Sequence, residues 1–191
     1  MADSDGGANF GPLAHHIDRF SEFDAKIDSA VDKVRNPALD HMFYALSSAA
    51  DHSVIWHVVG GLKSVRAGSL APARRLSKIL GVESALTNGP IKALFKRPRP
   101  EGFDELVEGV DGTLPYGMRI PITSSFPSGH ATAAFCAATV LSEDGNAVAW
   151  YCFAGLVASS RVYVRMHHAS DVIGGAVLGL ALGAVLRRVI R

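Results

Sequence analysis

The stretch SSFPSGHATAAF, residues 124–135, joins a polar tetrapeptide to an uncharged apolar segment. Pro127 and Gly129 alone would fit an ordinary turn, but the hydroxyl of Ser128 and the imidazole of His130 lie at the same helix start. Unpaired backbone N–H groups and the helix dipole make a helix N-terminus favourable for an anion. Gly129 has no side chain, so a ligand can approach the backbone there. The stretch therefore predicts a buried helix that begins at an oxyanion site, and we expect a phosphate group to bind there.

Similar apolar segments fill most of the chain after residue 40. Each charge-free run is shorter than the ~20 residues that cross a bilayer, so any one of them alone would also fit a buried core helix. Four or five such segments in one small chain leave too little polar surface for a soluble globule. We therefore predict an all-α integral membrane bundle of about five to six spans, with Pro90 kinking the second. The expected spans lie near residues 42–63, 74–95, 129–142, 147–165 and 171–187.

The N-terminal part has a different character. Residues 1–16, rich in Gly, Asp and Ala, predict a disordered tail. Over residues 17–36 apolar side chains such as Phe20 and Phe23 recur at helical spacing, which predicts an amphipathic helix at the membrane interface. Residues 40–191 then form the membrane domain. The 191-residue chain has a formal net charge of +1, which does not indicate a nucleic-acid partner.

Gly175, Gly179 and Gly183 recur at four-residue spacing in the last expected span. Such a face of small residues lets two helices approach closely in lipid, although the glycines could also simply make the helix flexible. The close approach could serve within the chain or between two copies. We therefore leave open a homo-oligomer that forms through these three residues.

Basic residues indicate an orientation in the cell membrane. Residues 63–78 carry five basic groups, and the C-terminal tail carries Arg187, Arg188 and Arg191. Both segments fall on the same side of a five-span bundle, and the positive-inside rule places that side in the cytoplasm. The opposite, extracytoplasmic side then holds the turn at residues 127–130 and two further polar clusters.

Those clusters contain the cations Lys92, Arg99 and Arg161, which have no obvious carboxylate partner nearby in the sequence. Guanidinium groups fit phosphate oxygens in a bidentate manner. Each cation lies where an apolar segment begins or ends, so the bundle would bring all three to one mouth. We expect them to bind a phosphate there together with Ser128 and Gly129.

The third cluster also contains His167 followed four residues later by Asp171. On a helix or tight turn, this spacing can place the carboxylate on one imidazole nitrogen, where it fixes the tautomer and stabilises the imidazolium. The other nitrogen is then free to attack phosphorus, and His130 can protonate the leaving alkoxide. No cluster of Asp, Glu or His has the pattern of a two-metal site. We therefore expect neither a metal nor another cofactor.

These residues fall into three motifs: K-x6-RP over residues 92–100, PSGH over residues 127–130 and SR-x5-H-x3-D over residues 160–171. In this order they resemble the three signature motifs of the type 2 phosphatidic acid phosphatase (PAP2) family. The resemblance covers roughly residues 40–187 and would make the membrane domain a phosphatase domain. Membrane members of this family usually have six spans and an outward-facing site.

The resemblance also implies a metal-independent mechanism with a phosphohistidine intermediate. It would make His167 the nucleophile, Asp171 its partner and His130 the acid. The implied phosphate ligands are Lys92, Arg99, Ser128, Gly129 and Arg161.

Two further stretches, AADHSVIWH at residues 49–57 and GVESALTNGPIKALFKRPRP at residues 81–100, look like the short actinobacterial members of the family. Some of these act on decaprenylphosphoryl-5-phosphoribose in the synthesis of arabinan precursors for the cell wall. The implied substrate is a prenyl-linked lipid phosphate monoester, such as decaprenylphosphoryl-5-phosphoribose 5-phosphate. Polyprenyl diphosphate, phosphatidate and phosphatidylglycerophosphate remain alternatives, because tail pockets are built from interchangeable aliphatic side chains.

Two other classes of protein fit part of the pattern. A soluble phosphatase or vanadate-dependent haloperoxidase would use the same motifs, and a non-catalytic membrane protein could bind anionic lipid through the basic mouth. We expect Lys96, Arg97 and Arg165 to anchor the bundle to lipid headgroups, or else to add a second phosphate contact. The acidic loop at residues 101–121 is either solvated or a lid that shapes headgroup selection.

Overall fold

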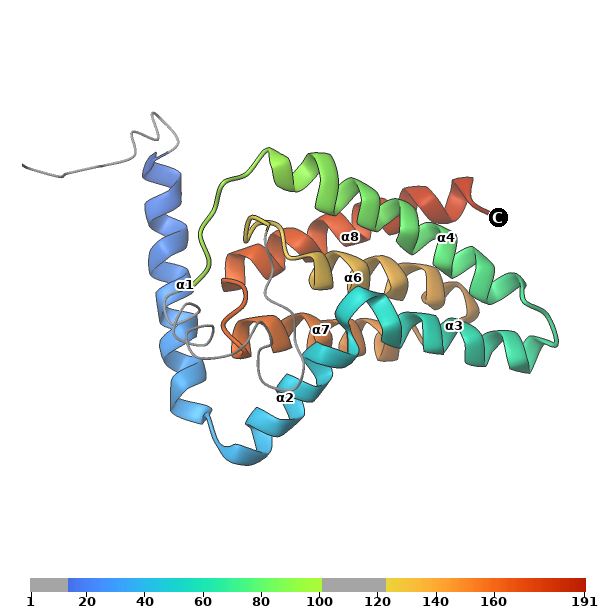
Figure 1. The fold of residues 1–191 in the computed structure, drawn as a ribbon, viewed down its shortest axis with the longest axis horizontal. Coiled ribbons are helices and arrows are strands. Elements are labelled where there is room, and N and C mark those ends of the chain that lie inside the picture. The colour runs from blue at the N-terminus through green and yellow to red at the C-terminus, as the bar shows by residue number, and fades with distance from the viewer. Residues whose placement is uncertain (1–13, 101–122) are drawn as a thin grey trace, which may run out of the picture.

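The computed structural model describes residues 14–100 and 123–191, and in these two ranges it contains helices and no strand (Figure 1). The all-α class is therefore confirmed for the described residues. The predicted loop at 101–121 and residues 1–13 of the predicted tail lie outside them.

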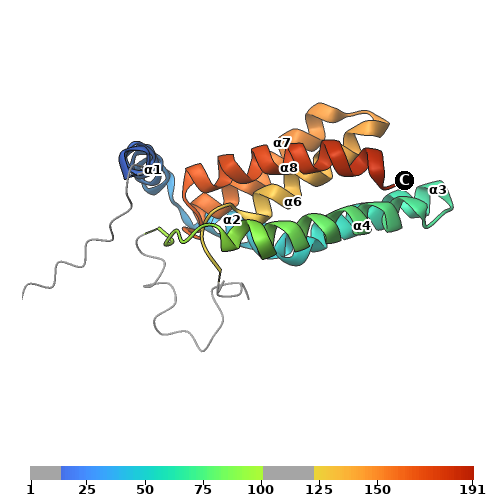
Figure 2. The same cartoon turned by 90° about the horizontal axis from the view of Figure 1, so that it is seen from above.

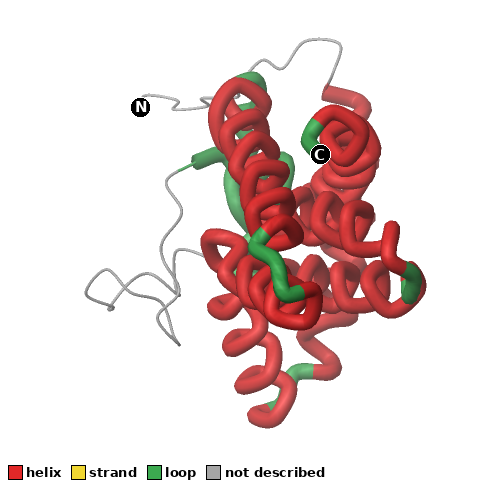
Figure 3. Tube along the Cα trace, turned by 90° about the vertical axis from the view of Figure 1, so that its right-hand side faces the viewer, coloured by secondary structure: helices red, strands yellow, loops and turns green. Residues whose placement is uncertain are grey.

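In chain order the longer helices are α1 (Ala14–Val34), α2 (Pro37–Ala49), α3 (Val54–Ala67), α4 (Ala71–Leu86), α6 (Gly129–Leu141), α7 (Ala147–Tyr163) and α8 (Ala169–Val189). The shorter turns are η2 (Asp51–Ser53), η3 (Thr87–Ile91) and η5 (Ser142–Asp144). Figure 3 shows how short most of the loops between the helices are.

The helix α6 forms the centre of the bundle and packs against α4, α7 and α8 (Figure 2). Its alanines Ala134, Ala137 and Ala138 are completely enclosed. Small side chains let neighbouring helices approach this helix closely, and its lack of charged groups allows it to be buried without ion-pair partners. The prediction of a buried, uncharged helix after the 127–130 turn is confirmed.

The glycine face of α8 packs against α6 of the same chain. A Cβ added at Gly175 would lie 2.5 Å from the carbonyl oxygen of Ser128, and one at Gly183 would lie 2.8 Å from Cβ of Thr139. Any side chain at these positions would force the two helices apart. All three glycines, Gly175, Gly179 and Gly183, are buried. Of the two alternatives left open for this face, the structure shows the close approach within the chain, because α6 covers the glycines; a homo-oligomer is not shown.

Four of the expected spans correspond to helices, namely α4 with η3, α6, α7 and α8. Among the described residues, α8 alone is both long enough and apolar enough to cross a membrane by itself. The expected span 42–63 is wrong as one continuous helix. The chain leaves helical geometry at His52 and Ser53, which both have positive φ, and this break separates α2 from α3.

The kink that Pro90 predicts is present. α4 ends at Leu86 and continues into the wider turn η3, in which Gly89 has non-helical backbone angles directly before Pro90. Proline cannot donate a backbone hydrogen bond and its ring clashes with the preceding turn, so a regular α-helix cannot continue through it. The wider turn carries the chain to Lys92 at the end of the bundle.

The helix α1 lies across the end of the bundle rather than along it (Figures 1 and 2), and it packs on α7 and α8. It ends before Asn36, whose side chain caps α2 by accepting hydrogen bonds from the N–H groups of Ala38 and Leu39. The predicted helix is thus present, although it begins at Ala14 and includes the last residues of the predicted tail; its location at the membrane interface stays a prediction.

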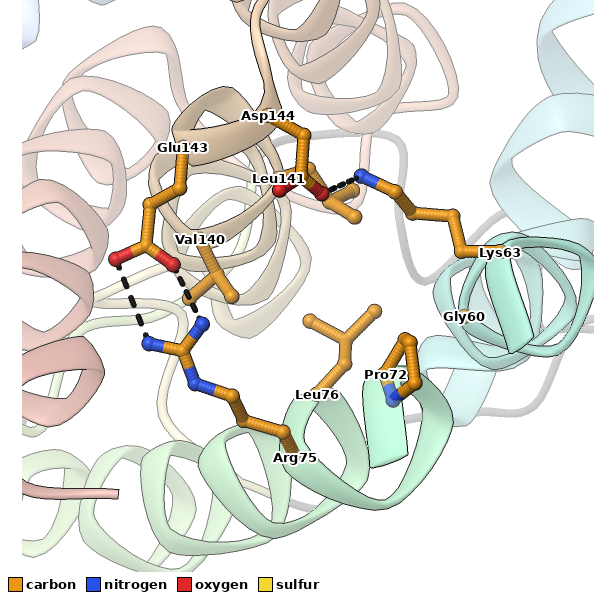
Figure 4. A pocket seen from close by; sticks show the side chains of 9 residues that line it. All are labelled: Gly60, Lys63, Pro72, Arg75, Leu76, Val140, Leu141, Glu143 and Asp144. Carbon is orange, nitrogen blue, oxygen red and sulfur yellow. Dashed lines mark hydrogen bonds and ion pairs between the residues drawn. The ribbon is translucent and has the colours of Figure 1, made fainter. Parts of the chain in front are cut away.

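The other end of the bundle is held by ion pairs and hydrogen bonds of basic residues. Arg75 donates hydrogen bonds to the carbonyl oxygens of Arg187 (2.7 Å) and Ile190 (2.9 Å) and pairs with Glu143, while Lys63 pairs with Asp144. A cavity of about 50 Å³ lies between these ion pairs (Figure 4). The two basic segments therefore share one end, at the opposite end of α6 from Ser128.

Candidate active site

Three segments that are distant in the sequence meet at the end of the bundle covered by α1. The backbone N–H of Ser125 donates to the carbonyl of Arg97 (3.0 Å), and that of Ser128 donates to the carbonyl of Asp171 (3.1 Å). The guanidinium of Arg99 donates to the carbonyl of Met166. The K-x6-RP, PSGH and SR-x5-H-x3-D segments are therefore joined to one another by hydrogen bonds.

Two of the predicted cations converge on Thr123. Nζ of Lys92 donates to Oγ1 of Thr123 (3.2 Å), and Nη2 of Arg99 donates to its carbonyl oxygen (3.1 Å). Arg161 is 2% exposed and donates through Nη1 to the hydroxyl of Ser47 in α2. Within the described residues, neither Lys92 nor Arg161 forms an ion pair with a carboxylate. Their positive charge thus remains available to an anion.

Unpaired polar atoms gather at the same place. In the described ranges, five buried side-chain nitrogen or oxygen atoms have no hydrogen-bond partner in the protein, and four of them belong to predicted site residues. Two are donors that suit an oxyanion, the hydroxyl of Ser128 and Nε of Arg161. A buried donor without a partner is costly, so these two groups fit a site built for a ligand with several acceptor oxygens. The others are Nε2 of His130, Nδ1 of His167 and Nδ1 of His168.

Packing gives a second reason why residue 129 is a glycine, besides the approach of a ligand to the backbone. A Cβ added there would lie 3.1 Å from Oδ1 of Asn88, which comes from the turn before Pro90. The first turn of α6 therefore packs directly against η3. This contact keeps the N–H end of α6 next to the segment that carries Lys92.

His167 lies in the loop between α7 and α8 and is 3% exposed. Its Nδ1 is 3.7 Å from Oδ2 of Asp171, so the two groups are adjacent but too far apart for a hydrogen bond. The sequence spacing predicts a contact across a helix or tight turn. In the structure the loop residue faces the third residue of α8, because the chain enters the helix between them.

The carboxylate of Asp171 is completely buried and held from several sides. Its Oδ2 accepts hydrogen bonds from the hydroxyl of Ser125 and from the backbone N–H of His168 (2.9 Å), and its Oδ1 pairs with Nη1 of Arg97. Its orientation beside the imidazole of His167 is therefore fixed by three partners.

The surroundings of His167 keep its ring neutral. Burial is the largest cause and lowers the pKa of the imidazole to about 3, which Asp171 opposes and the positive charges of Arg161 and Arg99 reinforce. A neutral imidazole retains a lone pair on one nitrogen. The structure thus supplies a potential nucleophile beside two cations.

His130 has a partner that the sequence analysis did not identify. Its Nε2 lies 2.9 Å from Oδ1 of Asp51 in the break between α2 and α3, although the direction of the ring N–H does not satisfy a hydrogen bond. Asp51 is the one formal charge between Met42 and Leu62. A lone carboxylate in an apolar stretch is a signal that could have identified it.

The expected headgroup anchors are wrong in two of three cases. Arg97 bridges Asp171 and Asp24, and Arg165 pairs with Asp32 of α1. Lys96 is exposed, as an anchor would be. In the described ranges, no group of three or more His, Cys, Asp or Glu side chains is arranged to hold a metal ion.

Comparison with known proteins identifies the arrangement. Residues 75–191 match the model of the PAP2 superfamily. Decaprenylphosphoryl-5-phosphoribose phosphatase from Mycolicibacterium smegmatis is 31% identical over 136 residues, which cover 69% of this chain and 68% of that protein. Lipid A 1-phosphatase from Porphyromonas gingivalis is 39% identical over 66 residues, and the chain spans 15% of its length.

Two solved structures share the fold. The chain is similar to a transmembrane PAP2-type phosphatidylglycerolphosphate phosphatase from Bacillus subtilis, with a TM-score of 0.67 and 22% identity over 93% of this chain and 89% of that one. It is also similar to LpxE from Aquifex aeolicus, with a TM-score of 0.64 and 26% identity over 86% of this chain and 94% of that one.

Proposed function

The chain belongs to the PAP2 superfamily, and from this premise we propose that it is a membrane phosphatase that hydrolyses a lipid phosphate monoester. The observation that carries the proposal is the gathering of unpaired donors and cations at one end of the bundle. The Ser128 hydroxyl and Nε of Arg161 lack partners there, and Lys92 forms no ion pair within the described part of the chain. A phosphate group satisfies all three.

Binding would place the phosphate at the start of α6. The N–H of Gly129 and the dipole of α6 would bind the phosphate from one side, and the guanidinium groups of Arg99 and Arg161 would bind it from other sides. Lys92 adds a further charge. Because this set of groups is held by the scaffold before the substrate arrives, it can stabilise the charge that develops on the equatorial oxygens in the transition state.

The chemistry would proceed in two steps. Nε2 of His167 attacks phosphorus, the P–N bond forms and the bond to the lipid oxygen breaks, while His130 gives a proton to the leaving alkoxide. Asp171 stabilises the imidazolium beside Nδ1. Water, deprotonated by His130, then attacks phosphorus and releases inorganic phosphate and neutral His167. None of these steps calls for a metal ion.

The substrate we favour is prenyl-linked, such as decaprenylphosphoryl-5-phosphoribose 5-phosphate, because the mycobacterial-type relative named for this lipid aligns over two thirds of both chains. The fold of the Bacillus protein keeps phosphatidylglycerophosphate as a second candidate. We place the enzyme in the cell membrane as a multi-pass protein, with the site on the extracytoplasmic side. The basic residues at the far end, including Lys63 and Arg75, support that orientation.

The test is phosphate release by the purified protein in detergent from a panel of lipids: polyprenyl-phosphoribose phosphate, polyprenyl diphosphate, phosphatidate and phosphatidylglycerophosphate. We expect release from the first, unaffected by EDTA, and none from the His167→Ala variant. The matched control is His57→Ala, an exposed histidine of α3 that contacts Ser77. Full activity of His167→Ala would contradict the mechanism, and tight lipid binding without turnover would favour a non-catalytic lipid-binding protein.

A further inference from the structure

The middle of α1 brings a carboxylate to the catalytic end of the bundle. Asp24 is 2% exposed, although it belongs to a helix whose other described residues are mostly at the surface. Its Oδ1 accepts a hydrogen bond from the backbone N–H of Ser170 (2.8 Å), and its Oδ2 accepts from the hydroxyl of Ser170 (2.6 Å) and from Nη2 of Arg97 (2.6 Å). α1 is therefore joined to the first turn of α8 by a buried charge.

Arg97 connects that charge to Asp171. One nitrogen of its guanidinium, Nη1, donates to Oδ1 of Asp171 and to the hydroxyl of Ser170 (2.7 Å), while Nη2 is occupied by Asp24. The guanidinium is planar and its donors have fixed directions. With one nitrogen assigned to each carboxylate, Arg97 can contact a single oxygen of Asp171.

Without Asp24, this arrangement would change in a definite way. A guanidinium beside one carboxylate prefers to bind both of its oxygens in a bidentate pair. Arg97 would then compete for Oδ2 of Asp171, the oxygen that faces Nδ1 of His167. This competition would act against the hydrogen bonds from Ser125 and from the backbone N–H of His168 that hold Oδ2, and it would draw the negative charge of the carboxylate away from His167.

We propose that Asp24 is a positioning residue, which keeps Arg97 on one oxygen of Asp171 and so leaves the other oxygen facing His167. The inference rests on the proposed function, since it requires that Asp171 acts on His167 during phosphoryl transfer. It makes the helix that lies across the bundle a part of the catalytic end, although the three family motifs lie elsewhere in the chain.

α1 offers a matched control. Asp32 pairs with Arg165 of the α7–α8 loop and so also ties α1 to the bundle. It is half exposed, however, and its partners Arg165 and Arg35 lie outside the catalytic cluster. If the only role of these aspartates were to attach α1 to the bundle, loss of either one would change kcat to a similar extent. If Asp24 acts through Arg97, only its loss alters catalysis.

The experiment compares Asp24→Asn and Asp32→Asn in the full-length protein, with kcat and KM measured on the best lipid phosphate. We expect kcat of Asp24→Asn to fall about tenfold to a hundredfold, as for a misplaced catalytic group, with KM within about threefold. Asp32→Asn should keep kcat within about twofold of the wild type. A kcat of Asp24→Asn within twofold of the wild type, or an equal loss in Asp32→Asn, would overturn the proposal.

Two further variants separate positioning from folding. Arg97→Lys keeps the charge but cannot serve both carboxylates with a planar fork, so it should show the same loss of kcat even if Asp24→Asn folds poorly. In an Arg97→Gln background, Asp24→Asn should cause no further loss of kcat, whereas a purely structural role makes the two losses multiply. Absence of phosphate release by the wild type would instead overturn the proposed function.

Discussion

Oδ1 of Asp51 lies 2.9 Å from Nε2 of His130. Asp51 belongs to η2, just before α3, whereas His130 belongs to the first turn of α6, so the two residues are far apart in the sequence. The contact exists because the helix breaks at residues 50–53 and turns the carboxylate toward the start of α6. It leaves Nδ1 of His130 as the nitrogen that can meet the leaving group. Asp51 would therefore hold the acid in place and favour its protonated form.

The Asp51→Asn variant should be impaired in protonating the leaving group. We expect its kcat on an alkyl phosphate lipid to fall by about tenfold to a hundredfold, a part of the ~10²–10⁴-fold that general acid catalysis supplies. With p-nitrophenyl phosphate, whose leaving group needs no proton, the loss should be small. Steady-state kinetics on both substrates provide the check, with Asp40→Asn in α2 as the control. Equal losses on the two substrates would exclude a role in protonation.

Arg161 should determine the affinity for oxyanions. Its unpaired Nε and its Nη groups form a fork that lysine cannot reproduce. A charge-assisted hydrogen bond is worth about 1.5–3 kcal/mol, so we expect Arg161→Lys to raise the inhibition constant of orthovanadate at least about tenfold. Arg165→Lys, which changes an arginine paired with Asp32, is the control. Unchanged inhibition of Arg161→Lys would show that the anion binds elsewhere.

The buried imidazole of His167 should make the folded protein sensitive to acid. Burial lowers its pKa from 6.5 to about 3, so between these values the unfolded state binds more protons than the folded state. The stability that the neutral imidazole of His167 contributes is therefore fully present above about pH 6.5 and is lost as the pH falls toward 3. We expect the thermal midpoint in detergent to fall less between pH 7 and pH 5 for His167→Gln than for the wild type. His57→Gln should follow the wild type, and parallel curves for all three proteins would refute the assignment.

The close packing of α6 and α8 should depend on the glycine face. In Gly183→Ala the new Cβ would lie 2.8 Å from Cβ of Thr139, and relief of such overpacking costs about 1–3 kcal/mol. Gly155 in α7 has open space around a built Cβ, so Gly155→Ala should be neutral or stabilising, by up to about 1 kcal/mol from helix propensity. Thermal unfolding in detergent distinguishes the two. If both variants had the same midpoint, the glycine face would not be needed for packing.

Much of the fold follows from local sequence. Apolar runs mark α4, α6, α7 and α8, Pro90 marks the kink, and the three motifs mark the segments that meet at the mouth. The break between α2 and α3 was not predictable from AADHS, because neither glycine nor proline is present and the positive φ angles fall on His52 and Ser53. Tertiary contacts must impose that geometry.

The ion pairs of the site were also beyond local reasoning. Arg97 and Asp24 are 73 residues apart, and hydrophobic periodicity does not record which distant charges will meet. A charged residue in an amphipathic helix is normally taken to face water, and this interpretation fails for Asp24 because α1 turns across the bundle and buries it. Arg97 lies within a cluster of basic residues, and such a cluster is normally taken to face water or lipid headgroups. Its sequence neighbours therefore do not indicate that it pairs with Asp24 and Asp171.

The closed far end has a consequence for where the product goes. Arg75 with Glu143 and Lys63 with Asp144 hold that end together, and between it and Ser128 lies the enclosed, alanine-rich interior of α6. A doubly charged inorganic phosphate has no hydrated route through such an interior. With the site on the extracytoplasmic side, as proposed, the phosphate would leave on the side from which the lipid headgroup came. Hydrolysis would then not transport phosphate across the bilayer, and the cell would need a separate carrier to recover it.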